Sequence, residues 1–119
     1  MITTILVIED EAIISLDLCF KLKDKGFTVY HSDDYYDALK IIYDKKPDLI
    51  ITDLKLKSGF VGIDIYNKFK DDGYKFIIIS GTNHDKKLDD FIKSENLIFV
   101  NKPFVFEDLF DKINELLNK

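Results

Sequence analysis

Carboxylates, a hydroxyl and a lysine stand where short apolar runs of the sequence end. Glu9 and Asp10 follow one run, Asp53 follows another, and Ser80 and Lys102 follow two more. Like charges 4 Å apart repel by about 4 kcal/mol at an effective dielectric of 20, so clustered carboxylates either hold protons or recruit a cation. Oxygen ligands without His or Cys nearby select a hard ion. Mg²⁺ fits best, because it takes one or two carboxylates plus a phosphoryl oxygen.

This set of side chains matches what phosphoryl transfer to a carboxylate requires. A carboxylate such as Asp53 attacks phosphorus in line, while a metal ion and the Lys102 ammonium neutralise the equatorial oxygens. The Ser80 hydroxyl would then contact the new phosphoryl group. Each residue alone also has a plainer explanation, such as an acidic first helical turn, a helix cap or a solvated loop charge. The prediction therefore depends on all of them meeting at one place.

Five short apolar runs predict the strands that would bring these residues together. The runs lie at 3–8, 27–31, 49–52, 76–79 and 97–100. Runs of this length without polar alternation are typical of parallel strands buried on both faces. Helix-length segments separate them, which predicts a doubly wound α/β domain of five β-α units. In such a sheet the strand carboxyl ends share one edge, where ligands bind.

Helical spacing predicts which side chains of these segments face the core. In segment 12–23 the apolar positions expected to do so are Ile13, Leu16, Cys19 and Phe20. Ser32 or Asp33 is expected to cap the second helix, and Gly73 to close the third.

Composition narrows the class of protein. The 119 residues predict one domain. A net charge of −5 argues against nonspecific nucleic-acid binding, which needs a basic face. The 1 Cys excludes a disulfide framework or a Cys/His zinc cluster and favours a reducing compartment. No apolar run reaches the ~20 residues of a membrane span, and the N-terminus lacks the basic start of a signal peptide. We expect a cytoplasmic protein without a membrane partner.

These residues, in this order, resemble the receiver domain of bacterial two-component response regulators, the fold typified by the chemotaxis regulator. The resemblance covers the whole chain. It rests on Glu9–Asp10 after the first strand, on Asp53 in LIITDL, on Ser80 after FIII, and on Lys102–Pro103–Phe104 after the fifth strand. Phe99 stands where the family has its switch aromatic. The resemblance implies a sheet with flavodoxin-like strand order 2-1-3-4-5.

The resemblance also implies roles for these residues. Asp53 would accept a phosphoryl group from the phosphohistidine of a sensor histidine kinase or a phosphotransfer protein. Asp10, Asp53 and the backbone carbonyl of Lys55 would hold Mg²⁺, with Glu9 acting mainly through bound water, and Lys102 would pair with the phosphoryl oxygens. Ser80 and Phe99 would switch on phosphorylation and alter the face made by the fourth helix, fifth strand and fifth helix, which a downstream protein reads. The Lys102–Pro103 bond would be cis.

The sequence departs from the family pattern at a few places. Glu9 stands where Asp is commoner, which lengthens the reach and keeps the charge. The loop LKLKSGFVG after the third strand lacks the Met-Pro pair of many members. Lys55 and Thr82 occupy the two positions that tune the lifetime of the phosphoryl group in this family. A lysine at 55 could cover that group and obstruct water, so we predict slow autodephosphorylation.

Other α/β classes fit less well. A dinucleotide-binding domain needs a Gly-rich turn after the first strand, and a flavodoxin needs a Ser/Thr/Gly-rich phosphate loop, whereas this chain has Glu9–Asp10–Glu11 there. An aspartyl phosphatase would need a second acid at position 55. The alternative that stays open is a degenerate receiver that docks without phosphorylation. Residues 1–119 are all used by the predicted receiver, without an output domain, so the chain is either a stand-alone regulator or a fragment. Dimerisation on phosphorylation is a family possibility.

Overall fold

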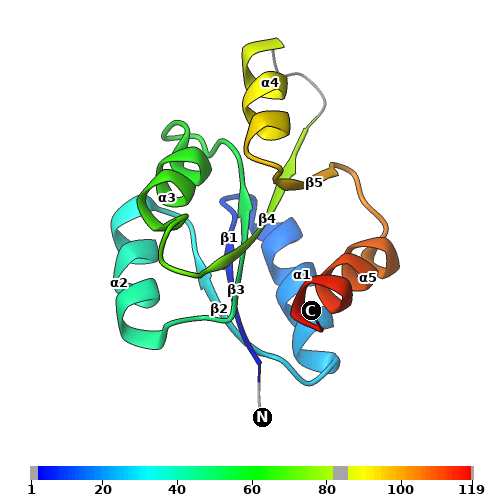
Figure 1. Ribbon diagram of the computed structural model, residues 1–119. Coiled ribbons are helices and arrows are strands. Elements are labelled where there is room, and N and C mark those ends of the chain that lie inside the picture. The colour runs from blue at the N-terminus through cyan, green and yellow to red at the C-terminus, as the bar shows by residue number, and fades with distance from the viewer. Residues whose placement is uncertain (1–2, 82–85, 119) are drawn as a thin grey trace.

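The computed structural model describes residues 3–81 and 86–118, which form one parallel sheet flanked by helices (Figure 1). The strand order is β2-β1-β3-β4-β5, and every neighbouring pair is parallel. The strands are β1 (Thr4–Ile8), β2 (Thr28–Ser32), β3 (Leu49–Asp53), β4 (Lys75–Ser80) and β5 (Ile98–Asn101). The predicted fold class and strand order 2-1-3-4-5 are therefore confirmed.

Four helices connect the strands, a fifth follows β5, and together they cover both faces of the sheet. They are α1 (Ala12–Asp24), α2 (Tyr35–Lys45), α3 (Val61–Phe69), α4 (Lys86–Ser94) and α5 (Phe106–Leu117). Figure 1 shows α1 and α5 together on one face and α2 and α3 on the other. None of the helices in the described part of the chain has the length and apolar content of a membrane span.

Alternating residues of the central strands fill the two apolar layers of the core. Ile5, Val7 and Ile51 point toward α1 and α5, in one cluster with buried residues of both helices. Leu6 and Ile50 point the other way, toward α2 and α3. Burial on both faces explains why these strands read as unbroken apolar runs.

Helix α1 corrects one prediction. Cys19 is buried as expected, but Ile13, Leu16 and Phe20 are 83%, 71% and 71% exposed. The sheet instead buries the face of α1 that carries Ser15, Leu18, Cys19 and Leu22. The helix has apolar residues on two faces, and its spacing alone does not say which of them meets the sheet.

Helix ends differ in part from the prediction. The N-cap of α2 is Asp34, whose side chain accepts a hydrogen bond from the Asp37 amide at 3.0 Å, and neither Ser32 nor Asp33 caps the helix. Ser32 closes β2 and donates its hydroxyl to the Asp34 carbonyl at 3.0 Å. Gly73 has a positive φ of 85° in the turn that follows α3, and the helix itself ends earlier.

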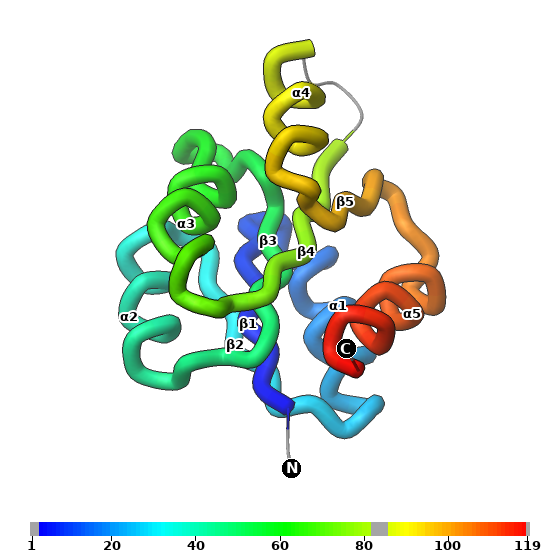
Figure 2. The backbone as a smooth tube through the Cα atoms, in the orientation of Figure 1, coloured from blue at the N-terminus to red at the C-terminus, as the bar shows by residue number. Residues whose placement is uncertain are grey.

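Parallel strands place all five carboxyl ends at one edge of the sheet. In the backbone trace of Figure 2 the start of β1 lies at the opposite, amino edge, so the segments that follow β1 and β3 lie on the far side of the sheet. The candidate reactive residues of the sequence analysis follow these strands, so the fold gathers them at this carboxyl edge.

Candidate functional site

Three carboxylates meet at the carboxyl edge. Strand β1 pairs with β3 so that Ile8 lies beside Thr52, which brings the next residues, Glu9 and Asp53, to adjacent strand ends. Oxygen atoms of Glu9, Asp10 and Asp53 all lie within 4.8 Å of one another. Glu9 is fully buried and Asp53 is 7% exposed, so two of the three carboxylates are shielded from water.

Lys102 supplies the positive charge at this edge. Its Nζ lies 2.6 Å from Asp53 Oδ2 and 2.7 Å from Glu9 Oε2. The backbone fixes its position, because the Lys102 amide donates to the Ser80 carbonyl at 2.7 Å and so extends the pairing of β4 with β5. The Lys102–Pro103 peptide bond is cis, as the family resemblance implied.

Burial and charge perturb two groups of this site. Burial raises the pKa of the Glu9 carboxyl above its ordinary value, and the ion pair with Lys102 opposes that rise only in part. Burial alone would lower the pKa of Lys102, but its bonds to Asp53 and Glu9 outweigh burial and raise it. Both pKa shifts favour the protonated form: burial is the main cause at Glu9, and the two neighbouring carboxylates are the cause at Lys102.

The loop between β3 and α3 closes over the carboxylates with backbone amides. The Lys57 amide donates to Asp10 Oδ2 at 2.6 Å, and the Lys55 amide lies 3.4 Å from Asp53 Oδ1. A tight turn in which Leu56 and Gly59 exchange two backbone hydrogen bonds, at 2.8 and 3.0 Å, shapes the loop. The contact from Lys57 was not predicted, because any residue type except proline can offer a backbone amide.

Gly62 is a second residue that the sequence analysis missed. It lies in the first turn of α3, where a Cβ atom would stand 2.0 Å from the carbonyl oxygen of Asp53. Only glycine lets the helix approach the end of β3 this closely. The available signal was a glycine at the start of an apolar helical segment, nine positions after the candidate carboxylate.

The other predicted residues lie around this centre. Ser80 ends β4 beside the strand of Asp53 and is 8% exposed. Phe99 on β5 is half-buried and packs against the cluster of Leu54, Ile78 and Ile92. The Lys55 side chain is exposed, with Nζ 5.4 Å from the centroid of the Phe60 ring. Thr82 lies outside the described residues.

The donor set fits a hard divalent cation. All three clustered side chains offer carboxylate oxygens. Glu9 Oε2 is the one fully buried side-chain oxygen or nitrogen in the described residues that has no hydrogen bond, although it forms an ion pair with Lys102. A buried anionic oxygen with an incomplete set of partners is the kind of ligand that a cation satisfies.

Comparison with known protein families agrees with this geometry. The model of the response regulator receiver domain matches residues 5–114. The chain belongs to this family. The match includes β2 to β5 and all of β1 except Thr4, and with them every side chain placed at the carboxyl edge.

Solved receiver structures share the fold at low sequence identity. A response regulator receiver domain protein from Methanospirillum hungatei superposes with a TM-score of 0.87 at 22% identity, over 99% of this chain and 95% of that one. The receiver domain of a modulated diguanylate cyclase from Desulfovibrio desulfuricans gives 0.85 at 20%, over 99% and 95%. NtrX from Brucella abortus gives 0.81 at 27%, where this chain covers only 26% of that longer protein.

Proposed function

We propose that this receiver domain is a phosphoacceptor in two-component signal transduction and that Asp53 is the residue phosphorylated. The single observation that carries the proposal is the Lys102 ammonium, which lies within 2.7 Å of oxygens of both Asp53 and Glu9 beside the Asp10 carboxylate. A nucleophilic carboxylate, a cation for phosphoryl oxygens and a set of hard-metal ligands stand together at one edge.

The phosphodonor is the phosphohistidine of a sensor histidine kinase or a phosphotransfer protein. An Asp53 carboxylate oxygen attacks phosphorus in line, and the new O–P bond makes an acyl phosphate. The P–N bond breaks, and its electron pair leaves on the imidazole nitrogen. Lys102 exchanges its contact with the Asp53 carboxylate for the phosphoryl oxygens. Later hydrolysis by water releases inorganic phosphate and restores the carboxylate, so the domain acts as a signalling protein and not as a turnover enzyme.

Mg²⁺ is the cofactor of this proposal. Glu9, Asp10, Asp53 and the backbone carbonyl of Lys55 would hold it. When bound, the ion supplies positive charge that stabilises the transferring phosphoryl group. The Lys57 amide fixes the Asp10 side chain, because it donates a 2.6 Å hydrogen bond to Oδ2 of this carboxylate.

Ser80 and Phe99 form the switch. Ser80 ends β4, the strand next to that of Asp53, so its hydroxyl can move toward a phosphoryl group on Asp53 and contact it. Phe99 packs in one cluster with Ile92 of α4, so a change at Phe99 is transmitted to that helix. The output is a changed face of α4, β5 and α5 that a downstream protein target binds, with dimerisation on phosphorylation as one form of that output.

Lys55 and Thr82 are proposed to tune the lifetime of the phosphoryl group. The Lys55 side chain is exposed, and its ammonium lies 5.4 Å from the centroid of the Phe60 ring in the same loop. Extended over the phosphoryl group, it would obstruct water. We predict that Lys55→Ala shortens the lifetime of the phosphorylated protein, and a decay rate equal to wild type would contradict this role.

The kinase or phosphotransfer partner is proposed to bind beside α1 in the cytoplasm. Ile13, Leu16 and Phe20 are exposed at three positions of this helix, and Ile13 lines a cavity together with Lys102. Exposed apolar side chains grouped next to a reactive centre are typical of a binding surface. Contact here would bring the donor histidine to Asp53.

Intact mass after incubation with a small phosphodonor and Mg²⁺ tests the proposal. Wild type should gain one phosphate, and the gain should vanish in Asp53→Asn and when Mg²⁺ is removed with EDTA. Circular dichroism of both proteins controls for folding. A folded wild type that gains no phosphate would favour the degenerate receiver, which docks without phosphorylation.

A further inference from the structure

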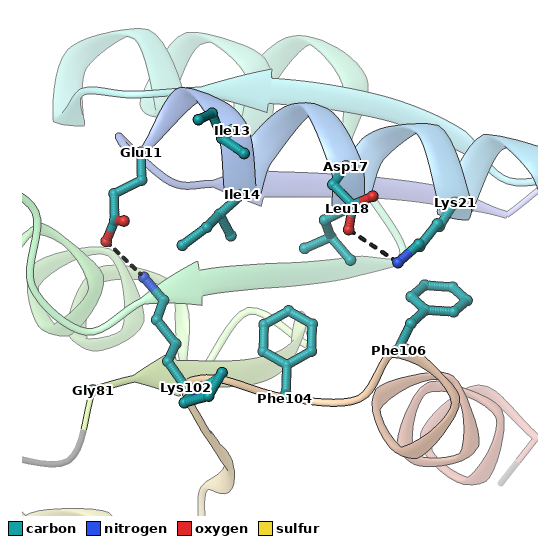
Figure 3. Close-up of a pocket in the computed structure, with 11 residues that line it drawn as sticks. Glu11, Ile13, Ile14, Asp17, Leu18, Lys21, Gly81, Lys102, Phe104 and Phe106 are labelled. Carbon is teal, nitrogen blue, oxygen red and sulfur yellow. Dashed lines mark ion pairs between the residues drawn. The ribbon is translucent and has the colours of Figure 1, made fainter.

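Glu11 is a carboxylate beside the site for which the proposed phosphotransfer gives no role. It occupies the N-cap position of α1, yet its side chain makes no capping hydrogen bond. Its backbone amide donates to Glu9 Oε1 at 3.0 Å. The side chain points across to Lys102, with Oε1 3.5 Å from Nζ (Figure 3). Helix capping therefore does not explain why this position carries a carboxylate.

Glu11 and Lys102 stand at one end of a cavity of about 600 Å³ between α1 and the segment that leads into α5. Figure 3 shows this pair at one end and a second ion pair, Asp17 with Lys21, at the other. The Asp17 carboxylate lies 3.0 Å from its own lysine. Two carboxylates thus line the same cavity, but only Glu11 adjoins the group that would receive phosphoryl oxygens.

The charge of Glu11 is poorly neutralised in this arrangement. Lys102 already pairs with Asp53 at 2.6 Å and with Glu9 at 2.7 Å, and Glu11 is its most distant partner. The Glu11 side chain is 56% exposed and lines the cavity, so its charge is accessible from outside the protein. Any molecule that approaches Lys102 from the cavity meets this negative charge first.

We propose that Glu11 is a specificity-determining residue that selects phosphodonors by charge. It disfavours donors whose leaving group is anionic and favours donors whose leaving nitrogen is neutral or protonated, such as phosphoimidazole. The inference rests on the proposed phosphorylation of Asp53. Its physical basis is that like charges near a partly exposed site repel, and that this repulsion alters the rate at which a donor reaches the site.

Two small donors isolate the effect because they deliver the same phosphoryl group. Acetyl phosphate is a dianion at neutral pH. When Asp53 attacks its phosphorus, the P–O bond breaks and acetate leaves with the electron pair. Phosphoramidate carries a protonated nitrogen and one negative charge fewer. When Asp53 attacks it, the P–N bond breaks and ammonia leaves with the electron pair. The acyl phosphate on Asp53 is identical in the two reactions, so a difference in rate reports on the donor.

The test is the ratio of the two initial phosphorylation rates, followed by intact mass at low ionic strength with saturating Mg²⁺. Glu11→Gln should raise the acetyl phosphate rate by about threefold to tenfold and the phosphoramidate rate by only about twofold to threefold, because one negative charge fewer halves the repulsion. The difference should shrink as salt is added, since screening weakens exposed charges. Glu11→Asp, which keeps the charge, should return the ratio toward that of wild type.

Asp17→Asn is the matched control, since it removes one negative charge from the same cavity at the end away from Lys102. Its rate ratio should equal that of wild type. An unchanged ratio in Glu11→Gln, or an equal change in Asp17→Asn, would overturn the inference while leaving phosphorylation of Asp53 intact. A wild type that accepts phosphate from neither donor would overturn the proposed function as well, so the two failures are distinguishable.

Discussion

The two ends of strand β3 are both buried, but they serve opposite purposes. Leu49 at the amino end is fully buried and packs into the apolar cluster under α1 and α5. Asp53 at the carboxyl end is almost as well buried and faces Glu9 and Lys102. Burying a leucine contributes about 1.5–3 kcal/mol, whereas a buried ion pair gains little once its desolvation is counted. The apolar end stabilises the fold, and the polar end is retained for its chemistry.

The contrast extends across the sheet. The central strands are apolar and fully buried for most of their length, and within residues 3–81 and 86–118 the buried acidic residues appear only where β1 and β3 end. A charged group that lacks water is stable there because the strands hold it against a lysine. Changes at the amino end should therefore lower stability and spare the chemistry, while changes at the carboxyl edge should impair the chemistry.

The largest loss of stability is expected from Leu49→Ala. Removing a fully buried leucine leaves a cavity, which lowers the free energy of unfolding by about 2–5 kcal/mol. Urea denaturation followed by circular dichroism measures the loss, since the chain has 0 Trp for a fluorescence probe. Phosphorylation per folded molecule should stay at the wild-type level. A fall in that activity would mean that the two ends of β3 are not separable.

Gly62→Ala should affect both properties. The added Cβ meets the Asp53 carbonyl at 2.0 Å, so α3 must move away from the end of β3. We expect a loss of about 1–3 kcal/mol in the free energy of unfolding and slower phosphorylation of the folded fraction. Gly81→Ala is the stability control, because a Cβ there meets nothing within 4 Å. Equal stability of the two variants would show that the close approach at Gly62 has no cost.

The strands and their chemical edge were predictable from the sequence for a physical reason. A strand buried on both faces must be apolar throughout, so the polar residue that ends it is visible as a break. Asp53 after LIIT is such a break, Lys102 follows the polar Asn101 that ends the fifth run, and the structure places Asp53 and Lys102 at one edge. The family match over residues 5–114 agrees with that interpretation.

Three features were not predictable in the same way. Helical spacing groups Ile13, Leu16 and Phe20 on one face of α1, but it does not say whether the sheet or the solvent meets that face. The Lys57 group that holds Asp10 is a backbone amide, so the residue type at position 57 does not predict the contact. Gly62 matters through an atom it lacks, so its role becomes visible only when α3 is placed against β3.

Lys102→Met tests what the lysine does at the carboxyl edge. The ammonium lies against Glu9 and Asp53, two of the proposed Mg²⁺ ligands, so it competes electrostatically with a divalent cation. Its removal should tighten Mg²⁺ binding by about tenfold, measured by isothermal titration calorimetry. Lys21→Met is the matched control, because Lys21 lines the same cavity but pairs with Asp17. Weaker Mg²⁺ binding in Lys102→Met would refute the competition.

The smallest expected effect is a pH dependence of stability that a change at Glu9 alters and a change at an apolar core residue does not. Burial raises the pKa of Glu9 in the folded protein above its unfolded value, so folding favours the protonated form. The contribution of Glu9 to stability is therefore most favourable below the unfolded pKa and declines as pH rises through the folded pKa. Glu9→Gln cannot ionise and should lack this decline.

Thermal unfolding in EDTA between about pH 4 and pH 8 measures this difference. The stability of Glu9→Gln relative to wild type should increase as pH rises, while Leu49→Ala should keep a constant deficit because it changes no titrating group. A difference between Glu9→Gln and wild type that is independent of pH would mean that Glu9 loses no more on burial than it gains from Lys102. Ionising Glu9 at the carboxyl edge would then cost no more free energy than ionising a glutamate at the surface. The two ends of β3 would then not differ in the electrostatic cost of burial.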